Sequence, residues 1–322
     1  MKFLVTGATG FIGWRVVSNL LARGIPVVAL DFPADPEAAA RLRARAGATP
    51  LTFVTVDVGD QAAVFSVLDA QRDITHVIHL AYLMSAECEA NPALAVRVNV
   101  AGMVNLFEAV LQRKLKRLVF TSSETYYGAK QEAFGDRPVT EDDFAPPSQH
   151  HFTYGVMKVL NEFMAQKYVQ RHGISLACVR PPVVFGHGRK RGSVLWAEDF
   201  ATKPALGQPV TLPFPAATRD VWLYVDDCAE QLVRLALADK LAHFAYNNGG
   251  ESVTAAELAA LVKRWLPKAE IAFDETKPGT PLIDRMDGSR LIREIGFTPR
   301  PLADGIRAHL NEARAAHHLP PV

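Results

Sequence analysis

The chain has 322 residues, of which 49% are hydrophobic and 21% are charged, so it can form one large core or one core with a smaller lobe. Lys and Arg (35) balance Asp and Glu (34), and the formal net charge of +1 provides no field that would recruit nucleic acid or an anionic membrane. These values leave a small molecule as the expected partner.

The three cysteines, Cys88, Cys178 and Cys228, are widely spaced and form no C-x-x-C pair, so neither a disulfide framework nor a zinc site is indicated. The apolar run after the first residues is only about four residues long, and no later run reaches about eighteen apolar residues. We therefore predict a cytoplasmic protein with no bound metal and no membrane segment.

Six short β-branched apolar runs alternate with longer helical patterns up to about residue 180. Their continuous hydrophobicity indicates strands that are buried on both faces, as in a parallel sheet covered by helices. In chain order, the runs are KFLVTG, IPVVALD, LTFVTVD, THVIHLA, KRLVFTS and ISLACVR. This pattern predicts an α/β fold with a doubly wound parallel sheet of the Rossmann type.

The rhythm changes after residue 181, where proline, glycine, charged and aromatic residues dominate. Helical patterns return later, with the short strand-like runs HFAYNN and AEIAFDE between them. We predict a Rossmann domain at 1–180, to which parts of 221–248 return, and a smaller C-terminal substrate-binding lobe at 181–322.

The stretch GATGFIG follows the first predicted strand, opens the first predicted helix and contains Gly7, Gly10 and Gly13. Glycines there permit a tight turn and let backbone N–H groups and the helix N-terminus approach a pyrophosphate. The spacing G-x-x-G-x-x-G differs from the commoner fingerprint, but the order of strand, glycines and helix favours a dinucleotide site over a chance cluster.

Asp31 closes the second predicted strand, where a carboxylate can accept hydrogen bonds from the adenosine ribose and would repel a 2′-phosphate. We therefore predict NAD rather than NADP, although Arg15 and Arg41 could act in the opposite sense and a helix cap is the alternative role of Asp31. Asp57 closes the third predicted strand, where we expect the adenine edge; a simple cap is equally compatible.

Tyr154 and Lys158 lie four residues apart in the helical pattern TYGVMKVLNE and therefore share one helix face. An ammonium beside a phenol favours the phenolate and lowers the phenol pKa from about 10. Such a pair alone is more often incidental. The fifth predicted strand, however, delivers Ser122 and Ser123 to the carboxyl edge of the sheet, where open α/β sheets bind ligands, and this combination favours an acid/base site.

The order of glycine-rich turn, serine-bearing strand end, then tyrosine and lysine on one helix resembles the extended short-chain dehydrogenase/reductase superfamily, specifically the NAD-dependent epimerase/dehydratase family. The similar segments span nearly the whole chain and are GATGFIG, HLAY, VRVNVAGMVNLFEA, TSSETYYG, YGVMK, YVDDCAEQLV and NNGGESVTAAELAALV. The resemblance implies an enzyme that moves hydride between NAD and a secondary alcohol or ketone. It also implies a homodimer through two helices per subunit, including the helix of Tyr154.

The resemblance implies that Tyr154 is the general acid/base, that Ser123 hydrogen-bonds the reacting oxygen, and that Lys158 holds the ribose and lowers the Tyr154 pKa. Asn99 either organises the central helix or is a buried, satisfied amide. The expected cofactor-binding residues are Gly7, Gly10, Phe11, Ile12, Gly13, Asp31, Asp57, Val58, Leu80, Ala81, Asn99, Tyr154 and Lys158. The expected substrate-binding residues are Ser123, Glu124, Tyr154, Val183, Trp196 and Arg219.

The chain departs from the family at three substrate positions. Glu124 is followed by Thr125, so the second carboxylate of the dehydratases is missing and water elimination is not expected. Val183 stands where nucleotide-sugar epimerases usually carry an asparagine that binds a diphosphate. The spacing between Arg219 and the VDD segment is longer than usual, which puts the role of Arg219 as a phosphate clamp in doubt.

The basic run RKR at 189–191 could replace Arg219, although a solvated charge run is the more ordinary interpretation. Trp196, Phe200 and Trp222 could line an apolar part of the pocket or belong to the core.

The departures favour a net dehydrogenase that acts on a sugar, a sugar acid or another small alcohol. The alternative is a sugar or nucleotide-sugar epimerase that retains its NAD. A third, non-enzymatic hypothesis is a dinucleotide-sensing binding protein on the same fold, which would have little need for Ser123, Tyr154 and Lys158 together.

Overall fold

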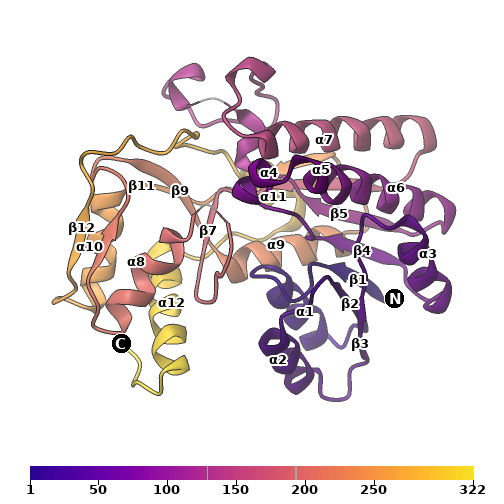
Figure 1. Ribbon diagram of the computed structural model, residues 1–322, viewed down its shortest axis with the longest axis horizontal. Coiled ribbons are helices and arrows are strands. Elements are labelled where there is room, and N and C mark those ends of the chain that lie inside the picture. The colour runs from indigo at the N-terminus through magenta and orange to yellow at the C-terminus, as the bar shows by residue number, and fades with distance from the viewer. Residues whose placement is uncertain (129, 193) are drawn as a thin grey trace.

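The computed structural model describes residues 1–128, 130–192 and 194–322. Its main sheet has seven parallel strands in the order β10-β6-β5-β4-β1-β2-β3 (Figure 1). The strands are β1 (Phe3–Thr6), β2 (Val27–Asp31), β3 (Leu51–Thr55), β4 (His76–His79), β5 (Arg117–Thr121), β6 (Leu176–Arg180) and β10 (Ala245–Asn247). The predicted doubly wound parallel sheet is confirmed, and all six predicted strands belong to it.

The strand order reverses between β1 and β4, which pair in parallel with Phe3 opposite His76. From this point β2 and β3 extend the sheet in one direction, whereas β4, β5 and β6 extend it in the other. Loops that leave the carboxyl ends on the two sides of such a reversal diverge and open a crevice.

Helices cover the sheet on both faces. On one side lie α1 (Gly13–Ala22), α2 (Pro36–Ala46) and α9 (Val225–Leu237), and on the other lie α3 (Gln61–Ala70), α6 (Gly102–Gln112) and α7 (Thr153–His172). In the first layer α1 contacts both α2 and α9, and in the second α6 contacts both α3 and α7. The apolar sides of the helices and both faces of the strands form the core, as the continuous hydrophobicity of the strands requires.

The helix α7 buries polar side chains and exposes apolar ones. Its buried residues include Lys158, Asn161 and Glu162, whereas Leu160 and Phe163 are exposed. Burial of charged groups costs free energy unless they are paired, so this inverted pattern indicates that the buried face has specific partners.

One helical run of the described residues, Pro92–Gln112, is long and apolar enough to span a membrane by length and composition alone, and half of its apolar window is buried within the protein. It consists of α5 (Pro92–Ala95), a π-helical turn (Val96–Ala101) and α6. Because α6 packs against α3 and α7, the buried part of this run belongs to a helical layer of the sheet.

A second group of elements lies beside the main sheet, at the left of Figure 1. It contains the sheets β11-β9-β7 and β12-β8. Its strands are β7 (Val183–Phe185), β8 (Val210–Leu212), β9 (Arg219–Tyr224), β11 (Glu251–Thr254) and β12 (Ile271–Phe273), and its helices are α8 (Trp196–Ala205), α10 (Ala255–Trp265) and α12 (Leu302–Ala316). The division of the chain near residue 180 stays a prediction, but α9 packs on β4 and β5 and β10 pairs with β6.

Shorter helices connect these parts. They are α4 (Ser85–Ala90), α11 (Ser289–Ile295) and the 3₁₀ turns Glu124–Tyr127, Gln131–Ala133 and Pro147–Gln149.

Candidate active site

A cavity of about 930 Å³ lies at the carboxyl ends of β1, β2, β4 and β5, where the strand order reverses. Most of the residues predicted from the sequence line it. These are Gly7, Gly10, Phe11, Ile12, Gly13, Asp31, Asp57, Val58, Leu80, Ala81, Ser123, Glu124, Tyr154, Val183 and Trp196. All predicted site residues belong to the described part of the chain. Three of them do not line the cavity: Asn99, Lys158 and Arg219.

The glycine turn is packed too tightly to accept side chains. Gly7 has a φ of +65°, and a Cβ there would lie 2.7 Å from the carbonyl carbon of Leu80, at the end of β4. A Cβ at Gly13 would overlap the carbonyl oxygen of Gly7. The spacing of these glycines is therefore required by the close approach of the turn to itself and to β4.

The N-terminus of α1 fits a pyrophosphate. Its N-cap, Ile12, makes no side-chain cap hydrogen bond, and the first turn contains no acidic residue. Within the described parts of the chain, the backbone N–H groups of Phe11 and Ile12 have no recorded acceptor. Unpaired N–H groups at a helix N-terminus bind anionic groups, so these residues fit the dinucleotide that the resemblance implies.

Asp31 ends β2 and is fixed against the glycine turn. Its Oδ2 accepts hydrogen bonds from the backbone N–H and the hydroxyl of Thr9, at 2.7 and 2.5 Å. Asp31 does not cap α2, because the carboxylate of Asp35 accepts from the first N–H groups of that helix. The cap alternative for Asp57 is also excluded, since Asp60 caps α3.

Tyr154 and Lys158 share the buried face of α7, as the spacing predicts. The Lys158 ammonium donates a hydrogen bond of 2.6 Å to the carbonyl oxygen of Thr121, at the end of β5. Its Nζ lies 3.0 Å from the centroid of the Tyr82 ring and 5.1 Å from that of the Tyr154 ring. The lysine therefore lies behind the tyrosine, between α7 and the sheet.

The predicted lowering of the Tyr154 pKa is not found. Burial raises the pKa of Tyr154 above its ordinary value, and burial likewise holds the pKa of Lys158 well below its ordinary value. Both neutral forms are favoured because each group has left water. The cation that acts to lower the pKa of Tyr154 is Arg189, although the effect of burial is larger.

Ser123 lies where β5 ends, and its Oγ accepts a hydrogen bond of 3.1 Å from the N–H of Thr125. Asn99 is a buried, satisfied amide: its Oδ1 accepts from the N–H of Leu83 and its Nδ2 donates to the carbonyl of the same residue. Its own carbonyl accepts from Asn161 on α7. Asn99 therefore holds the loop after β4 and α7 together from behind the cavity.

The other end of the cavity contains Glu124, Val183 and Trp196. Burial and the nearby Asp220 raise the pKa of Glu124 well above its usual range. Trp222 packs against both Trp196 and Phe200, but Trp222 and Phe200 are core residues, so only the first aromatic residue of α8 reaches the cavity.

The segment 280–282 also lines this end, and no sequence signal pointed to it. It belongs to an irregular stretch far along the chain from the Rossmann motifs. The Thr280 hydroxyl donates a hydrogen bond of 2.6 Å to Asp220, on β9, which attaches this stretch to the second lobe.

Arg219 does not lie in the predicted substrate site. Its guanidinium donates to the carbonyl of Ser252 at 2.9 Å and pairs with Glu257 at 3.4 Å, on the side of β9 that faces β11 and α10. These contacts direct the Arg219 side chain away from the cavity. The unusual spacing between Arg219 and the VDD segment agrees with this position.

Comparison with known proteins agrees with this geometry. The model of the "NAD dependent epimerase/dehydratase family" matches residues 3–249. The chain belongs to this family. An uncharacterized epimerase/dehydratase of Staphylococcus aureus strain USA300 is 28% identical, with 93% of this chain and 92% of the relative covered.

Two solved structures of family-like enzymes superpose on nearly the whole chain. UDP-glucose 4-epimerase of Thermus thermophilus, in complex with NAD, is 28% identical with a TM-score of 0.77 and covers 98% of this chain and 100% of its own. L-threonine dehydrogenase of Clostridium difficile has a TM-score of 0.84 and covers 99% of each chain, but at 23% identity it shows the fold alone.

In this family member, the basic run 189–191 is not simply a solvated charge run. Lys190 is exposed and pairs with Asp35 at 2.9 Å and with Glu37 at 3.1 Å, so the loop after β7 reaches across to α2. Arg189 instead lines the cavity, and its Nη1 donates to the carbonyl of Val184 at 2.7 Å.

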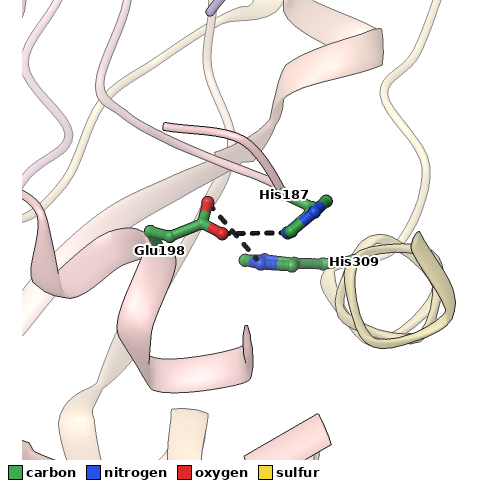
Figure 2. Close-up of side chains that lie close together, drawn as sticks. All are labelled: His187, Glu198 and His309. Carbon is green, nitrogen blue, oxygen red and sulfur yellow. Dashed lines mark hydrogen bonds and ion pairs between the residues drawn. The ribbon is translucent and has the colours of Figure 1, made fainter. Parts of the chain in front are cut away.

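A cluster of His187, Glu198 and His309 lies next to this loop and was not predicted. Their potential ligand atoms are all within 4.8 Å of one another, and Figure 2 shows the three side chains converging from the loop, α8 and α12. His187 Nδ1 lies 3.0 Å from Glu198 Oε1, and the Thr202 hydroxyl bonds Glu198 and His309 Nε2 at 2.7 and 2.9 Å. These hydrogen bonds join α12 to α8 and to the loop.

Proposed function

We propose that this protein is an NAD-dependent oxidoreductase that transfers hydride between NAD and the carbinol carbon of a small secondary alcohol, or runs this reaction in reverse. The observation that supports it best is the position of Tyr154: it lies on α7 in the same cavity as the glycine turn and Ser123. A proton acceptor, a hydroxyl and a dinucleotide turn in one cavity are the groups that alcohol oxidation requires.

In this proposal the Tyr154 hydroxyl takes the proton of the substrate alcohol, or returns it to the ketone, and Ser123 hydrogen-bonds the same oxygen. NAD, when bound, supplies the hydride acceptor. Lys158 holds Tyr154 and the end of β5 in place through its bond to the Thr121 carbonyl. Because burial favours the neutral phenol, ionisation of Tyr154 depends on positive charge near its oxygen.

The charges at the adenosine end favour NAD over NADP. Asp31 lines the cavity there with Asp35 and Glu37. Arg15, which could have bound a 2′-phosphate, is buried and paired with Asp226 and Glu312. Arg41 pairs with Glu37. An added 2′-phosphate would meet acidic groups whose neighbouring cations are already engaged.

The second candidate is an epimerase that retains its NAD, and the similarity to the Thermus UDP-glucose 4-epimerase supports it. Two features of the cavity favour the dehydrogenase. Val183 provides an apolar wall where an amide would bind a diphosphate, and Arg219 is directed elsewhere. We therefore expect a smaller alcohol than a nucleotide sugar.

The test is to incubate the purified protein with NAD and a panel of sugars, sugar acids and hydroxy amino acids, and to measure the absorbance of NADH. A dehydrogenase releases NADH in proportion to turnover, whereas an epimerase converts its substrate without added NAD and keeps the cofactor bound. Tyr154→Phe should lower kcat by about 100- to 10,000-fold and leave the Kd for NAD within about twofold.

The matched control is Tyr168→Phe, which removes a hydroxyl from the same helix; that hydroxyl bonds Glu108 outside the cavity. Its activity should equal that of the wild type. Unchanged turnover in Tyr154→Phe would contradict the role of Tyr154, and NAD binding without turnover of any substrate would favour the dinucleotide-sensing alternative.

We further propose that the protein is a homodimer in the cytoplasm. The exposed apolar residues Val156, Leu160 and Phe163 form a stripe along α7, and Val96 is exposed on the neighbouring π-helical turn. Exposed apolar residues at this spacing on two adjacent helices are typical of a helix-packed interface.

A further inference from the structure

Arg189 has a charged side chain in the cavity and no acidic partner. Its Nη1 donates to the carbonyl of Val184, and its guanidinium carbon lies 5.3 Å from the ring centroid of Phe11 in the glycine turn. The Nε atom is buried without a partner in the described chain, and no carboxylate of the described residues lies within ion-pair distance of the side chain. An unpaired buried donor is costly, which indicates that a ligand completes this site.

The backbone of Arg189 is also held in place. Its N–H donates a hydrogen bond of 3.0 Å to Glu198 Oε2. The other oxygen of Glu198 is held by His187, as Figure 2 shows, and by the hydroxyl of Thr202. Because the Glu198 carboxylate is used by this network, the loop is held in place while the guanidinium forms no ion pair with a carboxylate of the described residues.

Glu124 lines the same cavity and does not neutralise Arg189. Its side chain is almost fully buried and makes no recorded hydrogen bond within the described residues. Burial raises the pKa of Glu124 well above its usual range, which favours the neutral carboxyl group, whereas Arg189, with a pKa lowered to about 10, remains charged. The cavity therefore contains a charged guanidinium with no ion-pair partner among the described residues and, beside it, a buried carboxyl group with a free hydrogen-bonding capacity.

We infer that Arg189 binds a carboxylate of the substrate through the Nε and Nη2 edge of its guanidinium, while Glu124 hydrogen-bonds a substrate hydroxyl, so that the substrate class is a small hydroxy acid. A planar guanidinium edge matches the two oxygens of a carboxylate. The inference rests on the proposed function, because it places the reacting alcohol at Tyr154 in the same cavity.

The test compares matched pairs of probes that differ only in the acid group: glucose with glucuronate, galactose with galacturonate, propane-1,2-diol with lactate, and threoninol with threonine. For wild-type protein we expect kcat/KM for the acid to exceed that of its neutral partner in at least one pair. Arg189→Met should lower kcat/KM for that acid on the order of 100-fold, mainly by raising KM. The kcat/KM of Arg189→Lys should lie between those of the wild type and Arg189→Met.

Two controls complete the design. Lys203→Met removes an exposed positive charge on α8 that pairs with Asp199, and it should leave the preference for the acid unchanged. The Kd for NAD, measured by titration calorimetry, should stay within about twofold in Arg189→Met, and the Tm should show that the variant is folded. A loss of NAD affinity as large as the loss of kcat/KM would identify the cofactor pyrophosphate as the anion and overturn the inference.

A binding measurement separates this inference from the proposed function. The Tyr154→Phe variant, loaded with NAD, should bind the acid probes. The double variant that carries Tyr154→Phe and Arg189→Met should not bind them. If the acids bind in an Arg189-dependent way but no hydride is transferred, the proposed reaction is wrong and the carboxylate site stands. If the neutral probes are preferred, or if no acid binds, the carboxylate site is wrong.

Discussion

Arg180, at the end of β6, and Glu162, in α7, form an ion pair of 2.7 Å in which each side chain is only 1% exposed. The contact is bidentate, because Arg180 Nε also donates to the second carboxylate oxygen at 3.0 Å. Arg180 further donates to the Tyr127 hydroxyl and to the carbonyl of Glu141. This pair fixes the helix of Tyr154 to the sheet, and it explains why α7 can bury charged residues.

Removal of one partner should destabilise the protein more than removal of both. Glu162→Ala leaves the Arg180 charge buried and should lower the free energy of unfolding by about 3–5 kcal/mol. The double variant Glu162→Leu with Arg180→Met replaces both charges by apolar groups and should recover most of this loss. Urea unfolding monitored by circular dichroism measures both changes; a double variant no more stable than the single one would contradict the interpretation.

Tyr154 should ionise less easily than free tyrosine when no cofactor is bound, because burial raises its pKa. Ultraviolet difference titration of the wild type against Tyr154→Phe isolates its signal. We expect this signal above about pH 10 without NAD and at lower pH with NAD, since the oxidised nicotinamide adds positive charge. Ionisation near neutral pH in the cofactor-free protein would show that Lys158 alone lowers the pKa, contrary to the structure.

The exposed stripe on α7 predicts the oligomeric state. The double variant Leu160→Lys with Phe163→Lys places two charges on this stripe. Because Phe163 is already 57% exposed in the monomer, the variant should convert a dimer into a monomer without loss of secondary structure. Analytical ultracentrifugation measures the change. Ala62→Lys, on the exposed side of α3, is the control for an added charge. A wild-type protein that is monomeric at micromolar concentration would refute the proposed dimer.

Asp220 should make stability depend on pH. Burial raises its pKa from 3.8 to about 7, so between these values the folded protein binds a proton that the unfolded chain has lost. The contribution of Asp220 to the free energy of unfolding therefore decreases as the pH rises from about 4 to about 7. The decrease is at most about 4 kcal/mol. Asp220→Asn should flatten this dependence and raise the Tm at pH 8.

The matched control for this prediction is Asp136→Asn, which changes a fully exposed carboxylate that lies near Arg285. Its pH dependence should follow that of the wild type. If Asp220→Asn lowers the Tm at pH 8, the hydrogen bond from Thr280 to an ionised Asp220 stabilises the protein more than burial of that charge destabilises it.

The sequence was sufficient for those parts of the site that depend on local structure. Gly7 and Gly13 are required by a turn of a few residues, and Tyr154 and Lys158 meet because a helix brings positions four apart together. The predicted effect of Lys158 on the Tyr154 pKa is not found in the cofactor-free protein, because helical spacing reports proximity and does not report burial. Whether a group leaves water is decided by elements distant in the chain.

The substrate end was the least predictable part of the site. Arg189 enters the cavity because Glu198 and His187 hold its loop, and His309, from the last helix, joins that network. Arg219 lies elsewhere because Ser252 and Glu257 bind its guanidinium. These contacts join residues that lie from 9 to more than 100 positions apart, and no periodicity or motif in one sequence encodes them.

The pairing of β10 with β6 has a consequence for the order in which the protein can form during synthesis. About sixty residues separate Arg180, at the end of β6, from Ala245, where β10 begins, and they form the first part of the second lobe and α9. Until residue 237 has left the ribosome, the apolar faces of β4 and β5 lack α9, and until residue 247 has left it, the backbone groups along the outer side of β6 have no neighbouring strand. The nascent Rossmann half is therefore an aggregation-prone intermediate with an open sheet edge, and its completion waits for a late segment of the chain.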